Sequence, residues 1–333
     1  MLAVDARPRD VQPLAAGRDH DAVEAQHLTR SQFAQHSGAV DREVRAGDEH
    51  QQITSVPVPV KQYRLNRLFH PTSGRCFDVA VDHGMPGEAS MLAGIEDMAK
   101  AIDVLVDAKP DAIQLSVGQA DLLQRHPGRD KPALVLRTDT PNIYAAEAPE
   151  DAWSFVIDDP VGHAVRLDAA CVVINLLDVP GQDGLRRDCL EGISQLRAEC
   201  DRAGMPLMVE PLAFERGGGG GYQSSGDVDR IMGLVRQAVE LGADIIKADP
   251  TDDLSEYHRV TTVARVPLLL RGGGRVSDKE ILERTQTVLD QGAAGIVYGR
   301  NVIQHDNPAA MTAALMSVVH DGVSPADALA TLQ

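Results

Sequence analysis

Eight short apolar runs, separated by longer amphipathic segments, constrain the fold of this chain more than any other feature. The runs cover residues 77–81, 111–117, 133–137, 171–177, 206–212, 243–248, 266–271 and 294–299. Continuously apolar runs are typical of parallel strands buried on both faces, and the segments between them carry apolar residues at helical spacing. Eight strand–helix units within about 260 residues predict an α/β fold, a single (β/α)8 or TIM barrel.

Start and stop signals mark the segments between the runs as helices. Asp159 stands before Pro160, which suits the first helical position, and Ser277 begins another amphipathic segment. Gly204 and Gly242 follow the ends of two more helices. A doubly wound open sheet is the alternative fold, but no GxGxxG turn follows the first run, and eight strands suit a closed barrel.

The first 60 residues differ from the rest of the chain. They are largely polar, contain no lysine and show no persistent helical or strand period. Such a segment buries too little apolar surface to offset the entropy of ordering it. We therefore divide the chain into a low-order N-terminal extension, residues 1–60, and a (β/α)8 barrel, residues 61–333. A native start near Val56 is a second interpretation of the same pattern.

Charge and composition exclude several classes of function. The chain has 32 basic and 49 acidic side chains, a net charge of −17, which argues against a nucleic-acid or basic membrane-surface protein. No run reaches the roughly 18–20 apolar residues of a membrane span. The four cysteines show no CxxC or Cys/His spacing, so we expect buried thiols and no metal site. No signal-peptide pattern opens the chain, and we expect a cytoplasmic protein.

Lys247 is the one lysine of six that ends an apolar run, in ADIIKADP. The working residues of a TIM barrel lie at the carboxyl ends of its strands. Burial there disfavours the ammonium form and leaves an amine that can attack a carbonyl carbon to form a Schiff base. The alternative, left equally open, is a structural ion pair with Asp249, Asp82 or Glu210.

Carboxylates end two other runs. Asp82 and His83 follow the first run and Glu210 ends the fifth, which makes all three candidates for acid/base chemistry at the barrel mouth. A loop-capping Asp82 above a packed His83 is the alternative. The third run leads into Arg137 and Asp139, a charged pair at the same end of the barrel.

Glycines and arginines end the last two runs. They are Arg271, Gly272, Gly273 and Gly274 after the seventh run, and Gly299 and Arg300 after the eighth. Glycine amides can approach an anion closely, and these two loops form the usual phosphate site of the fold. Simple termination of the strands is the alternative. Five further glycines, 217–221, follow the fifth run and predict either a lid or a surface linker.

Together these residues resemble the class I, Schiff-base fructose-bisphosphate aldolases of the archaeal and bacterial DhnA-like type, in the deoxyribose-phosphate aldolase superfamily. The matching stretches are RLNRLFHPTSGR leading to VAVDHG, then GADIIKADP, then GAAGIVYGRNVIQHDNP, and they span most of residues 62–310. The resemblance implies a (β/α)8 barrel, a phosphorylated sugar substrate and a homo-oligomer. It also implies that Lys247 forms the Schiff base, that Asp82 handles protons or hydroxyls, and that Gly272–Gly274 with Gly299–Arg300 cradle the phosphate.

One departure from this family concerns its tyrosine acid/base. If Arg216–Gly217 is aligned, Phe214 stands at the position of that tyrosine. Phenylalanine cannot transfer a proton, so Glu210, His83 or Tyr222 would act in its place.

Three functions follow as hypotheses. The first is a lysine-dependent aldolase that cleaves or forms a carbon–carbon bond in a phosphorylated ketose, without metal or cofactor because the iminium withdraws the electrons. The second is a Schiff-base transfer enzyme, similar to aminodideoxyheptulosonate synthase or to a phospho-diketone thiolase. The third is a non-catalytic phosphosugar-binding protein.

Overall fold

The computed structural model describes residues 60–332. Residues 1–59, nearly all of the expected N-terminal extension, lie outside the described residues. Within residues 60–332, no helix is long and apolar enough to cross a membrane. All four cysteines of the chain are buried and none forms a disulfide.

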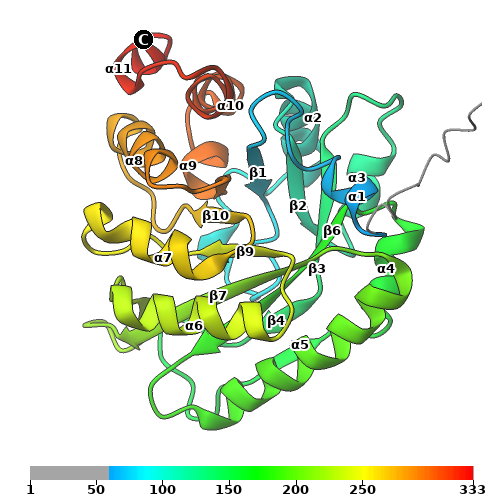
Figure 1. Cartoon of the computed structure of the whole chain (residues 1–333), viewed down its shortest axis with the longest axis vertical. Coiled ribbons are helices and arrows are strands. Elements are labelled where there is room, and N and C mark those ends of the chain that lie inside the picture. Colours follow the sequence, from blue (N-terminus) through cyan, green and yellow to red (C-terminus); the bar gives the residue numbers. More distant parts are fainter. Residues whose placement is uncertain (1–59, 333) are drawn as a thin grey trace, which may run out of the picture. The chain divides into compact units, whose positions relative to one another are not determined.

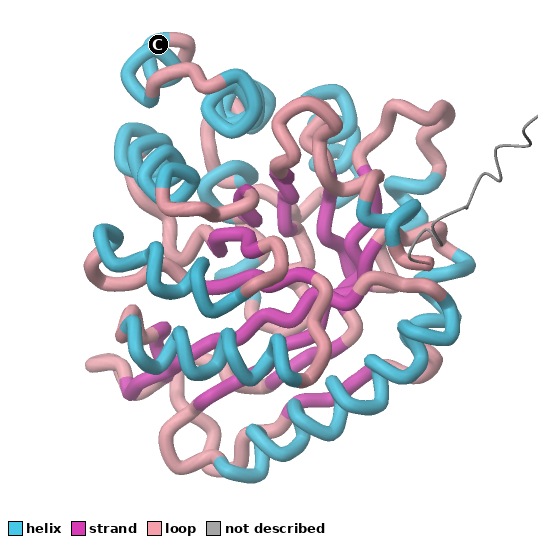
Figure 2. Tube along the Cα trace, viewed as in Figure 1, coloured by secondary structure: helices cyan, strands magenta, loops and turns pink. Residues whose placement is uncertain are grey.

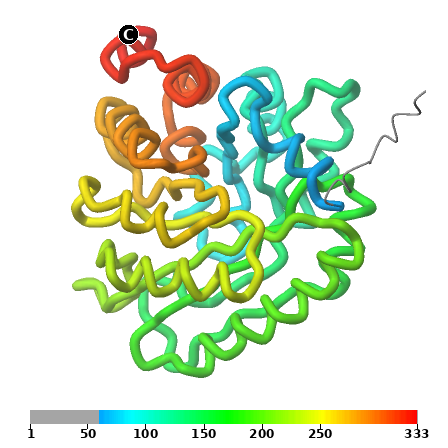
Figure 3. The backbone as a smooth tube through the Cα atoms, in the orientation of Figure 1, coloured from blue at the N-terminus to red at the C-terminus, as the bar shows by residue number. Residues whose placement is uncertain are grey.

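Eight parallel strands close into a barrel, and each of the eight predicted runs supplies one of them (Figure 1). They are β1 (Cys76–Ala80), β2 (Ala112–Ser116), β3 (Ala133–Arg137), β6 (Cys171–Asp178), β7 (Leu207–Arg216), β9 (Ile245–Ala248), β10 (Leu268–Arg271) and β11 (Gly295–Tyr298). Neighbours in this order pair in parallel, and β1 also pairs with β11, so the first strand lies beside the last (Figure 3). The predicted TIM barrel is confirmed.

Helices surround the ring of strands on the outside (Figure 2). The longer ones are α2 (Met98–Ala108), α4 (Pro160–Arg166), α5 (Asp183–Ala203), α6 (Val228–Glu240), α7 (Tyr257–Ala264), α8 (Asp278–Asp290) and α10 (Pro308–Met316). Shorter helices are α1 (Gln62–Leu65), α3 (Ala120–Gln124), α9 (Arg300–Ile303) and α11 (Pro325–Ala330), with single turns at Ala89–Met91, Leu254–Glu256 and Ser317–Asp321. Helices thus follow the strands in alternation, as the amphipathic segments predict.

The helix ends follow the sequence signals with one exception. Ser277 accepts a hydrogen bond from the Glu280 amide at the start of α8, and Gly204 ends α5 with a left-handed φ of 62°. Asp159 does precede Pro160 at the start of α4, but its side chain makes no capping hydrogen bond. Its carboxylate instead accepts a hydrogen bond from Arg166 at 2.9 Å.

The five glycines 217–221 form a turn between two antiparallel strands. The end of β7 pairs with β8 (Tyr222–Ser224), and the Gly217 amide donates to the Gly221 carbonyl at 2.8 Å. The Gly220 carbonyl accepts a hydrogen bond from the Ala148 amide at 3.0 Å. The segment is therefore a structured hairpin turn held against a neighbouring loop, where the sequence predicted a lid or a linker. A second short antiparallel pair joins β4 (Asp139–Pro141) to β5 (Ser154–Val156).

The period of two along the strands divides the barrel interior into an apolar and a polar layer. The inward residues of the apolar layer are Cys76, Ala112, Val135, Val173, Met208, Ile245 and Leu269. Two residues later along β2, β3, β6, β7, β9 and β10 stand Gln114, Arg137, Asn175, Glu210, Lys247 and Arg271. Because alternate residues of a strand face the same side, this second set also faces inward, one step nearer the carboxyl ends. Packing of the first layer thus positions the second.

Candidate active site at the carboxyl ends of the strands

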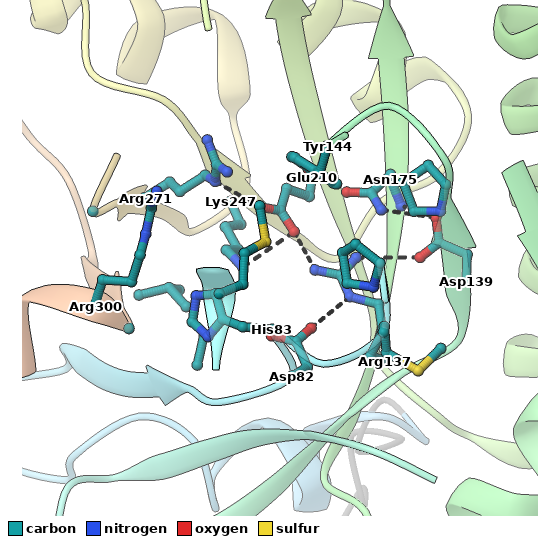
Figure 4. A pocket seen from close by; sticks show the side chains of 18 of the residues that line it. Asp82, His83, Arg137, Asp139, Tyr144, Asn175, Glu210, Lys247, Arg271 and Arg300 are labelled. Atoms are coloured by element: carbon teal, nitrogen blue, oxygen red, sulfur yellow. Dashed lines mark hydrogen bonds and ion pairs between the residues drawn. The ribbon is translucent and has the colours of Figure 1, made fainter. Parts of the chain in front are cut away.

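Lys247 projects from β9 into a pocket at the carboxyl ends of the strands (Figure 4). Its side chain is 4% exposed, and its Nζ lies 3.1 Å from Glu210 Oε2. Nζ also donates a hydrogen bond to Gln114 Oε1 at 3.2 Å. The lysine therefore lines the pocket and also forms one of the ion pairs that the sequence left open.

Arg137 connects three carboxylates around this lysine. Its Nε lies 2.8 Å from Asp82 Oδ2 and its Nη1 lies 3.2 Å from Asp139 Oδ1. Its Nη2 contacts Glu210 Oε2, the oxygen that also faces Lys247. The sequence identified Arg137 and Asp139 only as a charged pair; the structure places them within the pocket.

Asp82 and Glu210 are both held in the ionised form. Burial opposes ionisation of Glu210, but Lys247, Arg137 and Arg271 outweigh it and lower the pKa of Glu210 to about 2. Burial likewise opposes ionisation of Asp82, yet Arg137 and Lys247 hold its pKa well below the usual range. Two carboxylates able to accept a proton therefore flank the lysine. Gln114 links Asp82 to the lysine, because its Nε2 donates to Asp82 Oδ2 at 2.6 Å while its Oε1 accepts from Lys247 Nζ.

His83 also lines the pocket, as the sequence predicted. Burial lowers its pKa to about 4, although Asp82 acts in the opposite direction, so the imidazole is neutral near pH 7. The ring packs against Gly299, where an added Cβ would lie 2.3 Å from His83 Cε1. Any larger residue at position 299 would displace this histidine.

The glycines after β10 and the two nearby arginines gather on one side of Lys247. Arg271 and Arg300 lie together there, and Arg137 with Asp139 and Asn175 lies on the other side (Figure 4). Gly272, Gly273 and Gly299 line the lysine pocket, whereas Gly274 lines an adjoining cleft that shares Arg271, Gly273 and Arg300. The residues predicted to hold phosphate are therefore brought together beside the lysine.

Hydrogen bonds orient the peptide groups of this glycine segment. The Gly272 carbonyl accepts from Arg284 at 3.1 Å, and the Gly273 carbonyl accepts from Arg300 Nη2 at 2.9 Å. In a trans peptide the N–H points away from the carbonyl, so the amides of Gly273 and Gly274 face the opposite side. Within residues 60–332 neither amide donates a hydrogen bond. Free amides beside two guanidinium groups can bind an anion.

Arg271 and Arg300 differ in how their charges are balanced. Arg271 Nε lies 3.1 Å from Glu210 Oε1, and its Nη1 lies 2.7 Å from Asp249 Oδ1. Burial, and next the positive charge of Arg271, lower the pKa of Arg300. A negatively charged ligand at Arg300 would relieve both effects.

Tyr144 is a pocket residue that the sequence reasoning missed. It belongs to the loop that follows β4, and burial raises the pKa of its hydroxyl, which keeps the proton. Its ring packs edge-on against Phe214, with 6.1 Å between ring centroids. Tyr222 instead lines the adjoining cleft, where its hydroxyl accepts a hydrogen bond from Gln182. Of the three proposed substitutes for the missing tyrosine, only Glu210 and His83 line the lysine pocket.

Asn175 and Gln114 complete the polar layer and were also missed. Asn175 donates to Asp139 Oδ2 through its side chain at 2.9 Å and its backbone amide at 3.1 Å. Both residues stand inside apolar runs, two positions after an inward apolar residue. That spacing was the signal that could have identified them. Within residues 60–332, no group of three or more His, Cys, Asp or Glu side chains is arranged to hold a metal ion.

Similarity to known proteins covers most of the chain. Residues 76–305 match the DeoC/LacD family aldolases. The 2-amino-3,7-dideoxy-D-threo-hept-6-ulosonate synthase of Halobacterium salinarum is 30% identical over 81% of this chain and 95% of its own length. The 3-hydroxy-5-phosphonooxypentane-2,4-dione thiolase of Escherichia coli is 31% identical over 78% of this chain and 82% of its own length. The crystal structure of an archaeal fructose 1,6-bisphosphate aldolase is similar with a TM-score of 0.65 at 25% identity, over 79% of this chain and 100% of that one.

Proposed function

The chain belongs to the DeoC/LacD aldolase family, and on that premise we propose that it is a class I aldolase that cleaves or forms a carbon–carbon bond in a phosphorylated ketose. One observation carries the proposal. A lysine with a 4% exposed side chain ends a barrel strand, lines a pocket and contacts an ionised carboxylate at 3.1 Å. A buried lysine at a strand end is the residue type that condenses with carbonyl groups, and a carboxylate in contact with it can accept the proton that the ammonium releases.

In the cleavage direction, the Lys247 amine attacks the ketone carbon, and loss of water gives an iminium. Asp82 or Glu210 takes the proton of the hydroxyl beyond the bond to be broken. The carbon–carbon bond then breaks, the aldehyde leaves, and the electron pair moves toward the iminium nitrogen to form an enamine. Protonation of the enamine and hydrolysis of the imine release the second product and restore Lys247. The iminium withdraws electrons throughout, so this route uses no metal or cofactor.

The glycine segment after β10 and Arg300 would hold the substrate phosphate. Gly273 and Arg300 line the lysine pocket, Gly274 lines the adjoining cleft, and within residues 60–332 the amides of both glycines donate no hydrogen bond. The protein as a whole carries a charge of −17, which repels a phosphate at long range. Local donors must therefore supply the attraction, and these groups are placed to do so.

Borohydride trapping tests the proposal directly. Reduction in the presence of dihydroxyacetone phosphate or a phosphorylated ketose should add mass to one tryptic peptide, residues 237–259, because a modified Lys247 is no longer cleaved by trypsin. The adduct should disappear in Lys247→Ala and persist in Lys279→Ala, a surface lysine of α8 whose side chain is 69% exposed. Cleavage activity that survives Lys247→Ala would falsify the mechanism.

A transfer reaction to a second acceptor is the alternative function. It is favoured by Phe214 at the position of the aldolase tyrosine, and by the two similar proteins named as a synthase and a thiolase. Turnover that requires an added acyl or aldehyde acceptor, with the same Lys247 adduct, would distinguish transfer from simple cleavage. Tight phosphosugar binding without any borohydride adduct would instead support a non-catalytic binding protein.

A further inference from the structure

Asp78 is a buried carboxyl group for which the proposed aldolase steps have no use. It lies on β1, it is 0% exposed, and neither carboxylate oxygen has a hydrogen-bond partner in the part of the chain that is described. An unpaired polar group in a barrel interior lowers the free energy of unfolding, and an apolar side chain of similar size would avoid that loss. The residue therefore calls for a functional explanation.

The register of the barrel explains why Asp78 has no partner. Cys76 and Ala80, two residues before and after it, belong to the apolar cluster inside the barrel, so Asp78 also faces inward. Its neighbours on the adjacent strands are Ala112 of β2 and Val297 of β11, which offer no donor. The carboxyl group thus lies among apolar side chains, below the polar layer that contains Lys247.

Charged side chains on three other strands, and one that follows its own strand, act on Asp78. Lys247 of β9 is the charge that acts most strongly on it, and Arg137 of β3 acts in the same direction. Asp82, which follows β1, and Glu210 of β7 repel its negative form. The other strands present Gln114, Asn175 and Arg271 in the polar layer, and Cys76 lies on β1 itself. Lys247 is therefore the principal electrostatic partner of Asp78.

Asp78 differs from Asp82 and Glu210 in the pH range where it changes charge. Burial is the largest effect and raises its pKa to about 7, although Lys247 opposes the rise. The pKa of Glu210 is lowered to about 2 and that of His83 to about 4, so neither changes charge near neutrality. Asp78 therefore changes charge near neutral pH, where such a change alters the electrostatic potential at Lys247 under ordinary assay conditions.

We propose that Asp78 is a positioning residue that stabilises the cationic forms of Lys247, the ammonium and the iminium, and thereby sets the pH at which the lysine reacts. The iminium part of this inference rests on the proposed Schiff-base function. Asp78 acts through space: it forms no bond to substrate and transfers no proton to Lys247, because neither of its oxygens has a hydrogen-bond partner among residues 60–332. A negative charge within the low-dielectric interior favours a positive charge on Nζ.

The scarcity of lysine allows the charge of Lys247 to be measured directly. The chain has six lysines, so labelling lysine with ¹³C at Cε gives six NMR signals, and Lys247→Ala assigns the relevant one. In the unaltered protein, this signal should move in two steps with pH, a small one near pH 7 as Asp78 ionises and a larger one as Nζ loses its proton. In Asp78→Asn the small step should vanish and the midpoint of the larger step should fall by about one pH unit.

Cys76→Ala is the matched control. It changes an inward, uncharged side chain on the same strand, so both steps should keep their midpoints. An unaltered midpoint in Asp78→Asn, or a wild-type signal with no step near pH 7, would overturn the inference. If the Asp78→Asn variant does not fold, Asp78→Leu takes its place. If neither variant folds, the presence or absence of the step near pH 7 in the wild-type titration decides whether the inference holds.

Borohydride trapping over the same pH range separates this inference from the proposed function. If Lys247 forms the Schiff base, the pH midpoint of the trapping rate should fall in Asp78→Asn by the same amount as the NMR midpoint. A coupled titration of Lys247 without any borohydride adduct would refute the aldolase chemistry and leave the Asp78 effect standing. An adduct whose pH midpoint is the same in both proteins would refute the role of Asp78 and leave the aldolase standing.

Discussion

Glu210 is a pocket carboxylate that contacts three positively charged side chains. It lies 3.1 Å from Lys247 Nζ and 3.1 Å from Arg271 Nε, and it also contacts Arg137. Glu210→Gln removes the negative charge from all three contacts and a proton acceptor from the lysine. We expect kcat/KM to fall by about 100-fold or more, the range for loss of an acid/base group. Steady-state kinetics on a phosphorylated ketose measure this loss.

Glu215→Gln is the control for that prediction. Glu215 lies on the same strand but is exposed, and its side chain accepts a hydrogen bond from Gln223. Its kcat/KM should stay close to that of the unaltered protein. Glu210→Gln with an unaltered kcat/KM would show that this carboxylate only balances charge.

Tyr144 presents a phenolic hydroxyl to the pocket that Phe214 cannot supply. We expect Tyr144→Phe to lower the rate of carbon–carbon cleavage by about 10- to 100-fold, while the borohydride adduct at Lys247 still forms, because proton transfer follows imine formation. Tyr222→Phe removes a hydroxyl from the adjoining cleft and should leave cleavage nearly unchanged. Equal losses in the two variants would contradict a special role for Tyr144.

Single residues were predictable from the sequence where an apolar run ends in a polar side chain. Lys247, Asp82 and Glu210 were identified this way, because a strand end at the barrel mouth is a strong positional signal. Asn175 was not, since it interrupts an apolar run and only the inward period of two marks it. Tyr144 stands in an irregular loop, whose course depends on contacts with distant segments such as β7.

The segment from Arg271 to Ser277 is the element that the proposed phosphate site depends on most. Gly273 has a left-handed φ of 64°, so Gly273→Ala strains the turn that orients the adjacent amides. We expect KM for a phosphorylated ketose to rise about tenfold, equivalent to about 1.4 kcal/mol of binding. The KM for an unphosphorylated analogue such as dihydroxyacetone should change little. Comparison of the two substrates measures the phosphate contribution.

Gly292→Ala provides the matched control. The Arg271–Ser277 segment precedes α8, and Gly292 lies beyond the other end of that helix. Gly292 follows α8 with a φ of 94°, so alanine introduces similar backbone strain away from the pocket. The variant should lose stability without a change in KM. A rise in KM for both substrates in Gly273→Ala would indicate general distortion of the pocket and not loss of phosphate binding.

Barrel strands were more predictable than the smaller elements around them. Each of the eight runs is buried on both faces, so its apolar residues stand together in the sequence. The antiparallel strands β4, β5 and β8 have three residues each, too few to show alternation, and β5 and β8 contain exposed positions. Asp159 was identified as a helix cap from its residue type and position, but its carboxylate forms an ion pair with Arg166 and does not bond the backbone amides of α4.

At the scale of the whole molecule, residues 60–332 contain every barrel strand and every residue of the lysine pocket. We therefore expect a chain that starts at Val56 to form the borohydride adduct and to keep the thermal midpoint of the full chain. It retains Lys61, whose Nζ pairs with Asp244 at 2.8 Å and with Asp201 at 2.9 Å. Thermal unfolding and trapping test both points.

A chain that starts at Asn66 is the comparison. It lacks Lys61 and the hydrogen bond from Arg64 to the Ala169 carbonyl at 2.6 Å, so its thermal midpoint should fall. Loss of the adduct in the chain that starts at Val56 would show that residues 1–55 contribute to function.

The pH dependence of folding stability tests the burial of Asp78 in the intact barrel. The ordinary pKa of an aspartate in an unfolded chain is about 3.9, and burial raises that of Asp78 to about 7. Between these two values the folded protein holds a proton that the unfolded chain has released. Stability contributed by this group is therefore present at low pH and declines as pH rises to about 7, above which it is constant. Glu210, with its lowered pKa, acts in the opposite direction and loses its contribution only as pH falls toward 2.

Asp78→Asn abolishes the titration and should remove this decline. The free energy of unfolding of the variant, relative to the unaltered protein, should increase from pH 4.5 to pH 7 and then level off. Denaturant unfolding at half-unit steps of pH measures the difference. Cys76→Ala, which lies on the same inner face, should show a difference that is independent of pH. A constant difference for Asp78→Asn as well would mean that Asp78 is already ionised in the folded barrel below pH 5, and that Lys247 outweighs its burial.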